Sequence, residues 1–145
     1  MKIFIGADHR GFELKNNLFA ALQSQGHDVI DCGNTQLDPD DDFVLFAREV
    51  AEKVLADEAS LGIAICGSGV GVSIAANRIR GIRCGLALSP EQVAHARQND
   101  HTNMLALASQ FMTPETISAC VNSFLSNTPN ESPRYTHRNM MLDED

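Results

Sequence analysis

The stretch GIAICGSGVGVSIAA, residues Gly62 to Ala76, sets the fold of the chain around it. Its apolar run Ile63–Ile65 is typical of a short buried strand, and the residues from Val70 to Ile79 have the pattern of a helix. A turn with glycine at every second position lies between them. The stretch therefore predicts a strand, a glycine-rich loop and a helix, with Cys66 at the end of the strand.

The glycine-rich turn suits a bound anion. Gly67, Gly69 and Gly71 have no Cβ atoms, so the backbone can take left-handed angles and turn its N–H groups inward. The start of the following helix adds unpaired N–H groups and the positive end of its dipole. The same field favours the thiolate of Cys66, the form that acts as a nucleophile or base. Ser68 adds a hydroxyl that could donate to a developing oxyanion.

The spacing of these glycines is neither G-x-G-x-x-G nor G-x-x-x-x-G-K-[ST]. The dinucleotide-binding and P-loop interpretations therefore lack their signatures. From the residues alone, ordinary turn chemistry and a small buried cysteine are the commoner explanation of such a stretch.

Outward from this stretch, strand-like and helix-like segments alternate along the whole chain. Gly26 ends the first helix, and Ser89-Pro90 and Thr113-Pro114 begin the last two expected helices. We expect an α/β fold, a doubly wound, Rossmann-like, five-stranded parallel sheet with helices on both faces, in one domain over residues 1–145. The expected strands are 2–7, 27–32, 61–65, 81–88 and 103–108, and the expected helices are 12–23, 43–54, 70–79 and the segments that follow Ser89 and Thr113.

Ligands of such sheets bind beyond the carboxyl ends of the strands. Asp8 and His9 follow the first strand there, and the turn from Cys66 to Gly71 follows the third. Asn99 precedes the fifth strand, so ordinary topology does not place it in the same site. Residues 33–42 form an acidic loop whose aspartates we expect to be solvated.

The tail, residues 128–145, is polar and we expect little helix in it. It contains Arg134 and Arg138, four positions apart. Two such guanidinium groups could share one face of a turn and clamp a phosphate. Taken alone, they are more commonly ordinary surface arginines.

Composition excludes several classes of function. A formal net charge of -8 argues against binding the backbone of a nucleic acid. The apolar runs are shorter than the roughly 20 residues that span a bilayer, and Met1 leads directly into a strand, so we expect a cytoplasmic protein that does not enter a membrane. The four cysteines lack metal-like spacing, and we expect them to be reduced and without zinc.

Four motifs resemble ribose-5-phosphate isomerase B and its galactose-6-phosphate isomerase relatives: GADHRGFELK at 6–15, CGSGVG at 66–71, AAN at 75–77 and GIR at 81–83. The similarity covers essentially the whole chain. It implies an aldose–ketose isomerase that acts on a sugar phosphate, most closely ribose 5-phosphate and ribulose 5-phosphate, without metal or cofactor.

The resemblance also implies roles for individual residues. In cysteine-type members, the residue matching Cys66 moves a proton from C2 to C1 through an enediolate. Val72 stands where another branch has a glutamate, so this chain belongs with the cysteine type. The resemblance assigns the remaining residues as follows: Ser68, Gly67, Gly69, Val70 and Gly71 hold the enediolate oxygens, Asp8 serves the sugar hydroxyls or ring opening, and His9, Arg134 and Arg138 bind phosphate.

The family works as dimers or tetramers with sites between subunits, so the resemblance implies a homodimer or homotetramer. The tail, residues 128–145, is expected to pack on a neighbouring subunit.

Two positions depart from the family pattern. Asn99 stands at a substrate-contacting catalytic position where the family usually has a histidine that helps to open the sugar ring, and an amide cannot titrate near neutral pH. His101 lies two positions away and is a possible substitute. Gln110 replaces a frequent arginine, which would weaken phosphate binding or change the group bound.

These departures leave other functions open. A tetrulose 4-phosphate cannot close the usual furanose ring, so an isomerase for this linear sugar needs no ring-opening acid. A noncatalytic sugar-phosphate-binding subunit of a hetero-oligomer is a second alternative. A redox-sensing thiol protein is a third, although no second cysteine lies near Cys66 in the sequence.

Overall fold

The computed structural model describes residues 1–144; Asp145, the last residue of the acidic C-terminal end, lies outside them. Five strands form one parallel sheet in the order β2-β1-β3-β5-β4. They are β1 (Lys2–Ala7), β2 (Asp28–Asp31), β3 (Leu61–Cys66), β4 (Cys84–Leu86) and β5 (Met104–Ala108). The helices are α1 (Phe12–Ser24), α2 (Phe43–Ala56), α3 (Val70–Asn77), α4 (Pro90–Asn99), α5 (Pro114–Ser126) and α6 (Pro133–Leu142).

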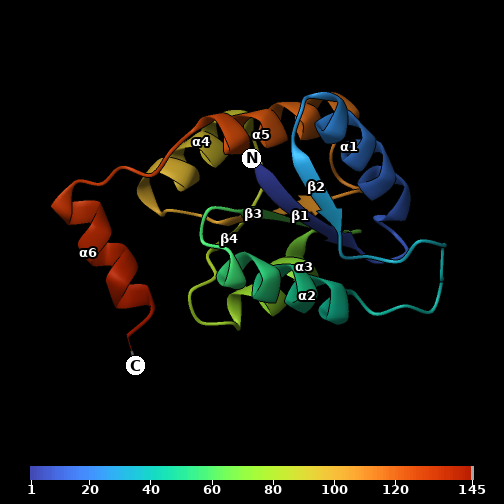
Figure 1. Ribbon diagram of the computed structural model, residues 1–145, viewed down its shortest axis with the longest axis horizontal. Coiled ribbons are helices and arrows are strands. Elements are labelled where there is room, and N and C mark those ends of the chain that lie inside the picture. Colours follow the sequence, from blue (N-terminus) through green and yellow to red (C-terminus); the bar gives the residue numbers. More distant parts are fainter. Residues whose placement is uncertain (145) are drawn as a thin grey trace.

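Helices cover both faces of the sheet and create three layers (Figure 1). One core joins the sheet to α1, α4 and α5, and the other joins it to α2 and α3. All six residues of β3 are buried. A strand covered on both faces reads as a continuous apolar run, which is why the third strand was clear in the sequence. The expected doubly wound α/β fold is confirmed.

The predicted starts of α4 and α5 are confirmed by their caps. Ser89 Oγ accepts a hydrogen bond from Gln92 N at 3.1 Å, and Thr113 Oγ1 accepts one from Thr116 N at 3.2 Å. A proline at the first helical position loses no hydrogen bond, because that N–H has no partner within the helix.

The fourth strand is shorter than the predicted 81–88. Arg83 N donates to the side chain of Asn103 at 2.8 Å, and Asn103 Nδ2 donates to Gly81 O at 2.8 Å. Side-chain bonds of Asn103 thus add to the backbone bond from Asn103 N to Arg83 O, 3.0 Å, and residue-by-residue pairing with β5 begins at Cys84.

The expectation of a helix-poor tail is wrong, because α6 fills most of it. Ser132 and Pro133 begin α6 with the same Ser-Pro pair that begins α4. The helix is polar on most of its surface, so apolar periodicity did not reveal it. In Figure 1, α6 projects from one end of the three layers. Within residues 1–144, no helix combines the length and apolar character needed to cross a membrane.

Candidate active site

The sheet order changes direction between β1 and β3, and ligands of parallel sheets bind beyond the carboxyl ends of the strands at such a switch point. Ala7 pairs with Ile65, and Asp8 N donates to Ile65 O at 3.2 Å. Asp8 and His9 therefore leave β1 beside the point where Cys66 leaves β3, as the sequence predicted.

Backbone bonds fix the turn that carries the thiol. Cys66 is 5% exposed and pairs with Ala108 of β5. Its carbonyl accepts a hydrogen bond from Ser109 N at 3.0 Å, and Gly67 O accepts one from Gln110 N at 3.0 Å. The thiol is thus held between the ends of three neighbouring strands.

The turn leads into α3 through Gly69, which has a φ of 72°. A Cβ atom there would lie 2.6 Å from Leu86 Cδ1 and 3.0 Å from the backbone carbon of Leu107, so only glycine fits. Ser68 is exposed, and its hydroxyl oxygen accepts from Val70 N at 3.2 Å. Because that bond uses the oxygen as acceptor, the hydroxyl proton remains available for donation to a ligand.

Asp8 is buried and forms the start of the loop before α1. Its Oδ1 accepts from Arg10 N at 2.9 Å and from Gly11 N at 3.1 Å. The carboxylate therefore holds the loop in shape and lies at the switch point of the sheet together with His9.

Asp41 contacts His9 although it lies 32 positions further along the chain. Its Oδ1 accepts from His9 N at 2.8 Å and lies 2.9 Å from ring Nδ1. The Asp41 side chain is only 6% exposed, so the expectation that the loop aspartates are solvated is wrong for this residue. A contact over this separation has no local sequence signal; the run of four aspartates at 38–42 gave no reason to single one out.

Arg10 also lies at the site, and the sequence did not single it out. A Cβ atom on Gly67 would lie 2.9 Å from Arg10 Cδ and 2.9 Å from Gln110 Oε1. Gln110, at the position where a family arginine was expected, thus lies next to the thiol turn.

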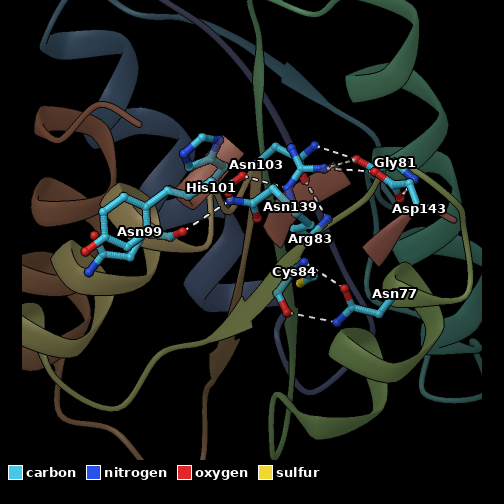
Figure 2. Close-up of polar contacts among 10 residues, drawn as sticks. Asn77, Gly81, Arg83, Cys84, Asn99, His101, Asn103, Asn139 and Asp143 are labelled. Carbon is cyan, nitrogen blue, oxygen red and sulfur yellow. Dashed lines mark hydrogen bonds and ion pairs between the residues drawn. The ribbon is translucent and has the colours of Figure 1, made fainter. Parts of the chain in front are cut away.

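Asn99, Arg134 and Arg138 lie in a different part of the molecule, and we call them the tail cluster. Asn99 ends α4, and its carbonyl accepts from Asn139 of α6 at 3.2 Å (Figure 2). The two arginines are four residues apart on α6, share one helical face and are exposed.

Asp143, just after α6, joins this helix to the loop before β4. Its carboxylate accepts from Gly81 N at 2.9 Å and lies 3.4 Å from Arg83 Nη1 (Figure 2).

Within a single chain, the tail cluster and the Cys66 thiol lie at opposite ends of the sheet. Met104 pairs with Gly62 at one end of the sheet and Ala108 pairs with Cys66 at the other, about 13 Å along the strand at 3.3 Å per residue. Asn99 precedes β5, at the end away from Cys66. His101 lies at that same end, where its Nε2 is 2.9 Å from Asn130 O.

The other three thiols have different surroundings. Burial raises the pKa of Cys32 to about 11 and that of Cys84 to about 12, and it also raises the pKa of Cys120. All four cysteines are free. Cys84 and Cys120 are buried, whereas Cys32 is half-buried. Among residues 1–144, no three His, Cys, Asp or Glu side chains come together in a way that could hold a metal ion.

Known proteins are similar to this chain in both sequence and fold. Residues 3–142 match the family described as "Ribose/Galactose Isomerase". Ribose-5-phosphate isomerase B of Mycolicibacterium paratuberculosis is 38% identical over 144 residues, 99% of this chain and 91% of that protein. The probable ribose-5-phosphate isomerase B of Mycoplasma pneumoniae is 45% identical over 85% of this chain and 81% of its own.

Solved structures of proteins in this family have the same fold as this chain. The ribose 5-phosphate isomerase of Thermotoga maritima superposes with a TM-score of 0.93 at 38% identity, over 99% of this chain and 98% of that one. The ribose-5-phosphate isomerase B of Mycoplasma genitalium, solved with bound ribulose 5-phosphate, has a TM-score of 0.92 at 38% identity over 97% and 93% of the two chains. The chain therefore belongs to the ribose/galactose isomerase family of enzymes.

Proposed function

We propose that this protein interconverts an aldose phosphate and its ketose, ribose 5-phosphate and ribulose 5-phosphate or a close analogue. The observation that carries the proposal is the position of Cys66: it ends β3 at the switch point of the sheet and is followed at once by the glycine turn and the start of α3. Isomerisation next to a carbonyl needs a base on one face and preorganised donors at the oxygen that gains charge. The thiol and the turn supply these two elements.

In the proposed reaction the Cys66 thiolate removes the proton from C2 of the open-chain aldose, and the electron pair moves to the carbonyl oxygen. The resulting enediolate is held by N–H groups of residues 67–71 and by the Ser68 hydroxyl. The proton of the C2 hydroxyl passes to the oxygen on C1, and the thiol returns the carbon-bound proton to C1, which produces the ketose with no external oxidant or reductant. Asp8 contacts the sugar hydroxyls and His9 the phosphate.

We further propose that the complete site forms between two chains. The tail cluster lies at the wrong end of its own sheet to meet Cys66, so a partner chain has to supply Asn99, Arg134 and Arg138. Exposed apolar side chains support this arrangement: Val70 and Ile74 on α3 are 46% and 52% exposed, and Leu88 after β4 is 68% exposed.

Subunit complementation tests the shared site. Cys66→Ala and the double variant Arg134→Ala, Arg138→Ala are each expected to be nearly inactive. Co-expressed in equal amounts, they should regain about a quarter of the parent activity, because half of the dimers are mixed and each mixed dimer has one intact site. Activity no higher than that of the separate variants would refute the shared site while leaving the thiol chemistry open.

One observation favours a second substrate class. Asn99 cannot serve as a ring-opening acid, and the ring of His101 is occupied with Asn130 O. A linear tetrulose 4-phosphate would not need such an acid.

Proton NMR with ribose 5-phosphate, allose 6-phosphate, galactose 6-phosphate and erythrulose 4-phosphate would decide the substrate class. Fastest turnover of ribose 5-phosphate would reject the tetrulose alternative. Turnover of none, by folded protein, would favour a noncatalytic subunit of a hetero-oligomer.

A further inference from the structure

The loop at residues 33–42 is tied to the candidate site through one buried carboxylate. Asp41 Oδ1 meets both the backbone N–H and ring Nδ1 of His9, at 2.8 and 2.9 Å. Its other oxygen, Oδ2, accepts from Asn34 Nδ2 at 3.0 Å. Three contacts on a side chain that is 6% exposed fix the position of this carboxylate.

A buried lysine of α1 also helps to hold Asp41 in place. Lys15 is fully buried and donates to Asn34 O at 2.8 Å and to Asp31 Oδ2 at 2.6 Å. Lys15 therefore holds the backbone of Asn34, whose side chain in turn holds Asp41. The arrangement leaves Asp41 little freedom to move away from His9.

Contact with Asp41 orients the imidazole ring. Because Nδ1 faces Asp41, Nε2 lies on the far side of the ring, and the His9 side chain is 31% exposed. In the charged imidazolium both ring nitrogens donate, one to the carboxylate and one outward. In this orientation the outward nitrogen can form a charge-assisted hydrogen bond to a phosphate oxygen.

We propose that Asp41 is a positioning residue for His9: it fixes Nδ1 and so orients the ring, which leaves Nε2 facing the phosphate of the substrate. The inference rests on the proposed function, in which His9 binds phosphate. It adds a residue to the site that contacts no substrate itself and acts only through His9.

A double-mutant cycle tests this relationship with Asp41→Asn, His9→Asn and the two combined. Asp40→Asn is the matched control, since it removes the same charge from an exposed position of the same loop. Binding of inorganic phosphate, measured by calorimetry, is the first readout, and KM and kcat for the sugar phosphate are the second. Asp41→Asn keeps the shape of the side chain, and Asn34 can turn its amide to meet it.

Asp41→Asn should weaken phosphate binding and raise KM by about tenfold, the value of one charge-assisted hydrogen bond, with kcat changed less than about twofold. In the His9→Asn background the same change should have no further effect, and Asp40→Asn should behave like the parent. If Asp41 had a purely structural role, Asp41→Asn would instead lower kcat and stability. Its effect on phosphate binding would then add to the effect of His9→Asn in the double variant. Full additivity, or unchanged phosphate binding in Asp41→Asn, overturns the proposal.

A fallback variant and a readout that does not depend on turnover complete the experiment. If Asp41→Asn does not fold, Asn34→Ala removes one bond to Asp41 and should weaken phosphate binding about threefold, again only while His9 is present. If no sugar phosphate is turned over by any variant or the parent, the proposed function fails, yet the phosphate cycle still decides the role of Asp41. Absence of phosphate binding by the parent would overturn that role.

Discussion

Arg10 Nη1 donates a hydrogen bond of 3.0 Å to Gln110 Oε1, and the two side chains meet beside Gly67. The pair joins the loop after β1 to the segment after β5. A second bond joins the same two segments, because Ser109 Oγ donates to Arg10 O at 2.8 Å. A glutamine at position 110 thus positions a cation next to the thiol turn.

Gln110→Ala should therefore weaken substrate binding through Arg10. We expect KM to rise about threefold to tenfold, because an exposed charged donor loses its acceptor. Steady-state kinetics in the parent and in an Arg10→Ala background check this prediction. Equal effects of Gln110→Ala in both backgrounds would show that the glutamine does not act through Arg10.

Two glycines of the turn should respond differently to alanine. Gly69 has a φ of 72° and packs against the backbone of Leu107, so Gly69→Ala should cost at least about 2 kcal/mol and lower Tm by roughly 4 to 8 °C. A Cβ on Gly67 would meet only the ends of two flexible side chains, those of Arg10 and Gln110. Gly67→Ala should keep its Tm within about 2 °C but lose at least about tenfold in activity. Thermal unfolding together with kinetics separates the two; similar Tm losses would contradict this assignment.

Thiol modification should depend on pH in a residue-specific way. A raised pKa means that the reactive thiolate appears only at high pH. With a pKa of about 11, roughly one Cys32 thiol in a thousand is ionised at pH 8, and for Cys84, at about 12, roughly one in ten thousand. Labelling of Cys32 by iodoacetamide should be slow at pH 8 and should rise about tenfold per pH unit up to pH 10. Peptide mass spectrometry measures the labelling rates, and a rate for Cys32 that does not change with pH would refute this prediction.

Local patterns in the sequence predicted most of the fold. The buried strands are continuous apolar runs, and Ser89-Pro90 and Thr113-Pro114 begin helices as expected. The same type of signal at Ser132-Pro133 was present but was outweighed by the polar character of the tail, and α6 was missed.

The candidate site was predicted unevenly, for a physical reason. The thiol turn and Asp8 follow strand ends, so topology alone brings them together. Asp41 reaches His9 through a loop closure over 32 residues that leaves no periodic pattern. The meeting of Arg10 with Gln110 spans 100 residues and likewise depends on tertiary packing.

The residue at position 99 should determine whether cyclic sugars are good substrates. Asn99→His introduces a group that titrates near neutral pH and can move a proton between ring oxygen and anomeric hydroxyl. We expect it to raise kcat/KM for ribose 5-phosphate about tenfold or more, while that for erythrulose 4-phosphate stays within about twofold. Parallel assays of both sugars provide the measurement. An equal change for the two substrates would show that position 99 has no role in ring opening.

The central claim is that Cys66 carries the substrate proton, and isotope exchange tests it most directly. The parent protein in deuterated water, given its best sugar phosphate, should incorporate deuterium at the carbon that receives the proton, as seen by proton NMR. Cys66→Ala should fold normally, still bind inorganic phosphate, and exchange at least about a thousandfold more slowly. Exchange at the parent rate by the folded Cys66→Ala protein would contradict the account and assign the base to another residue.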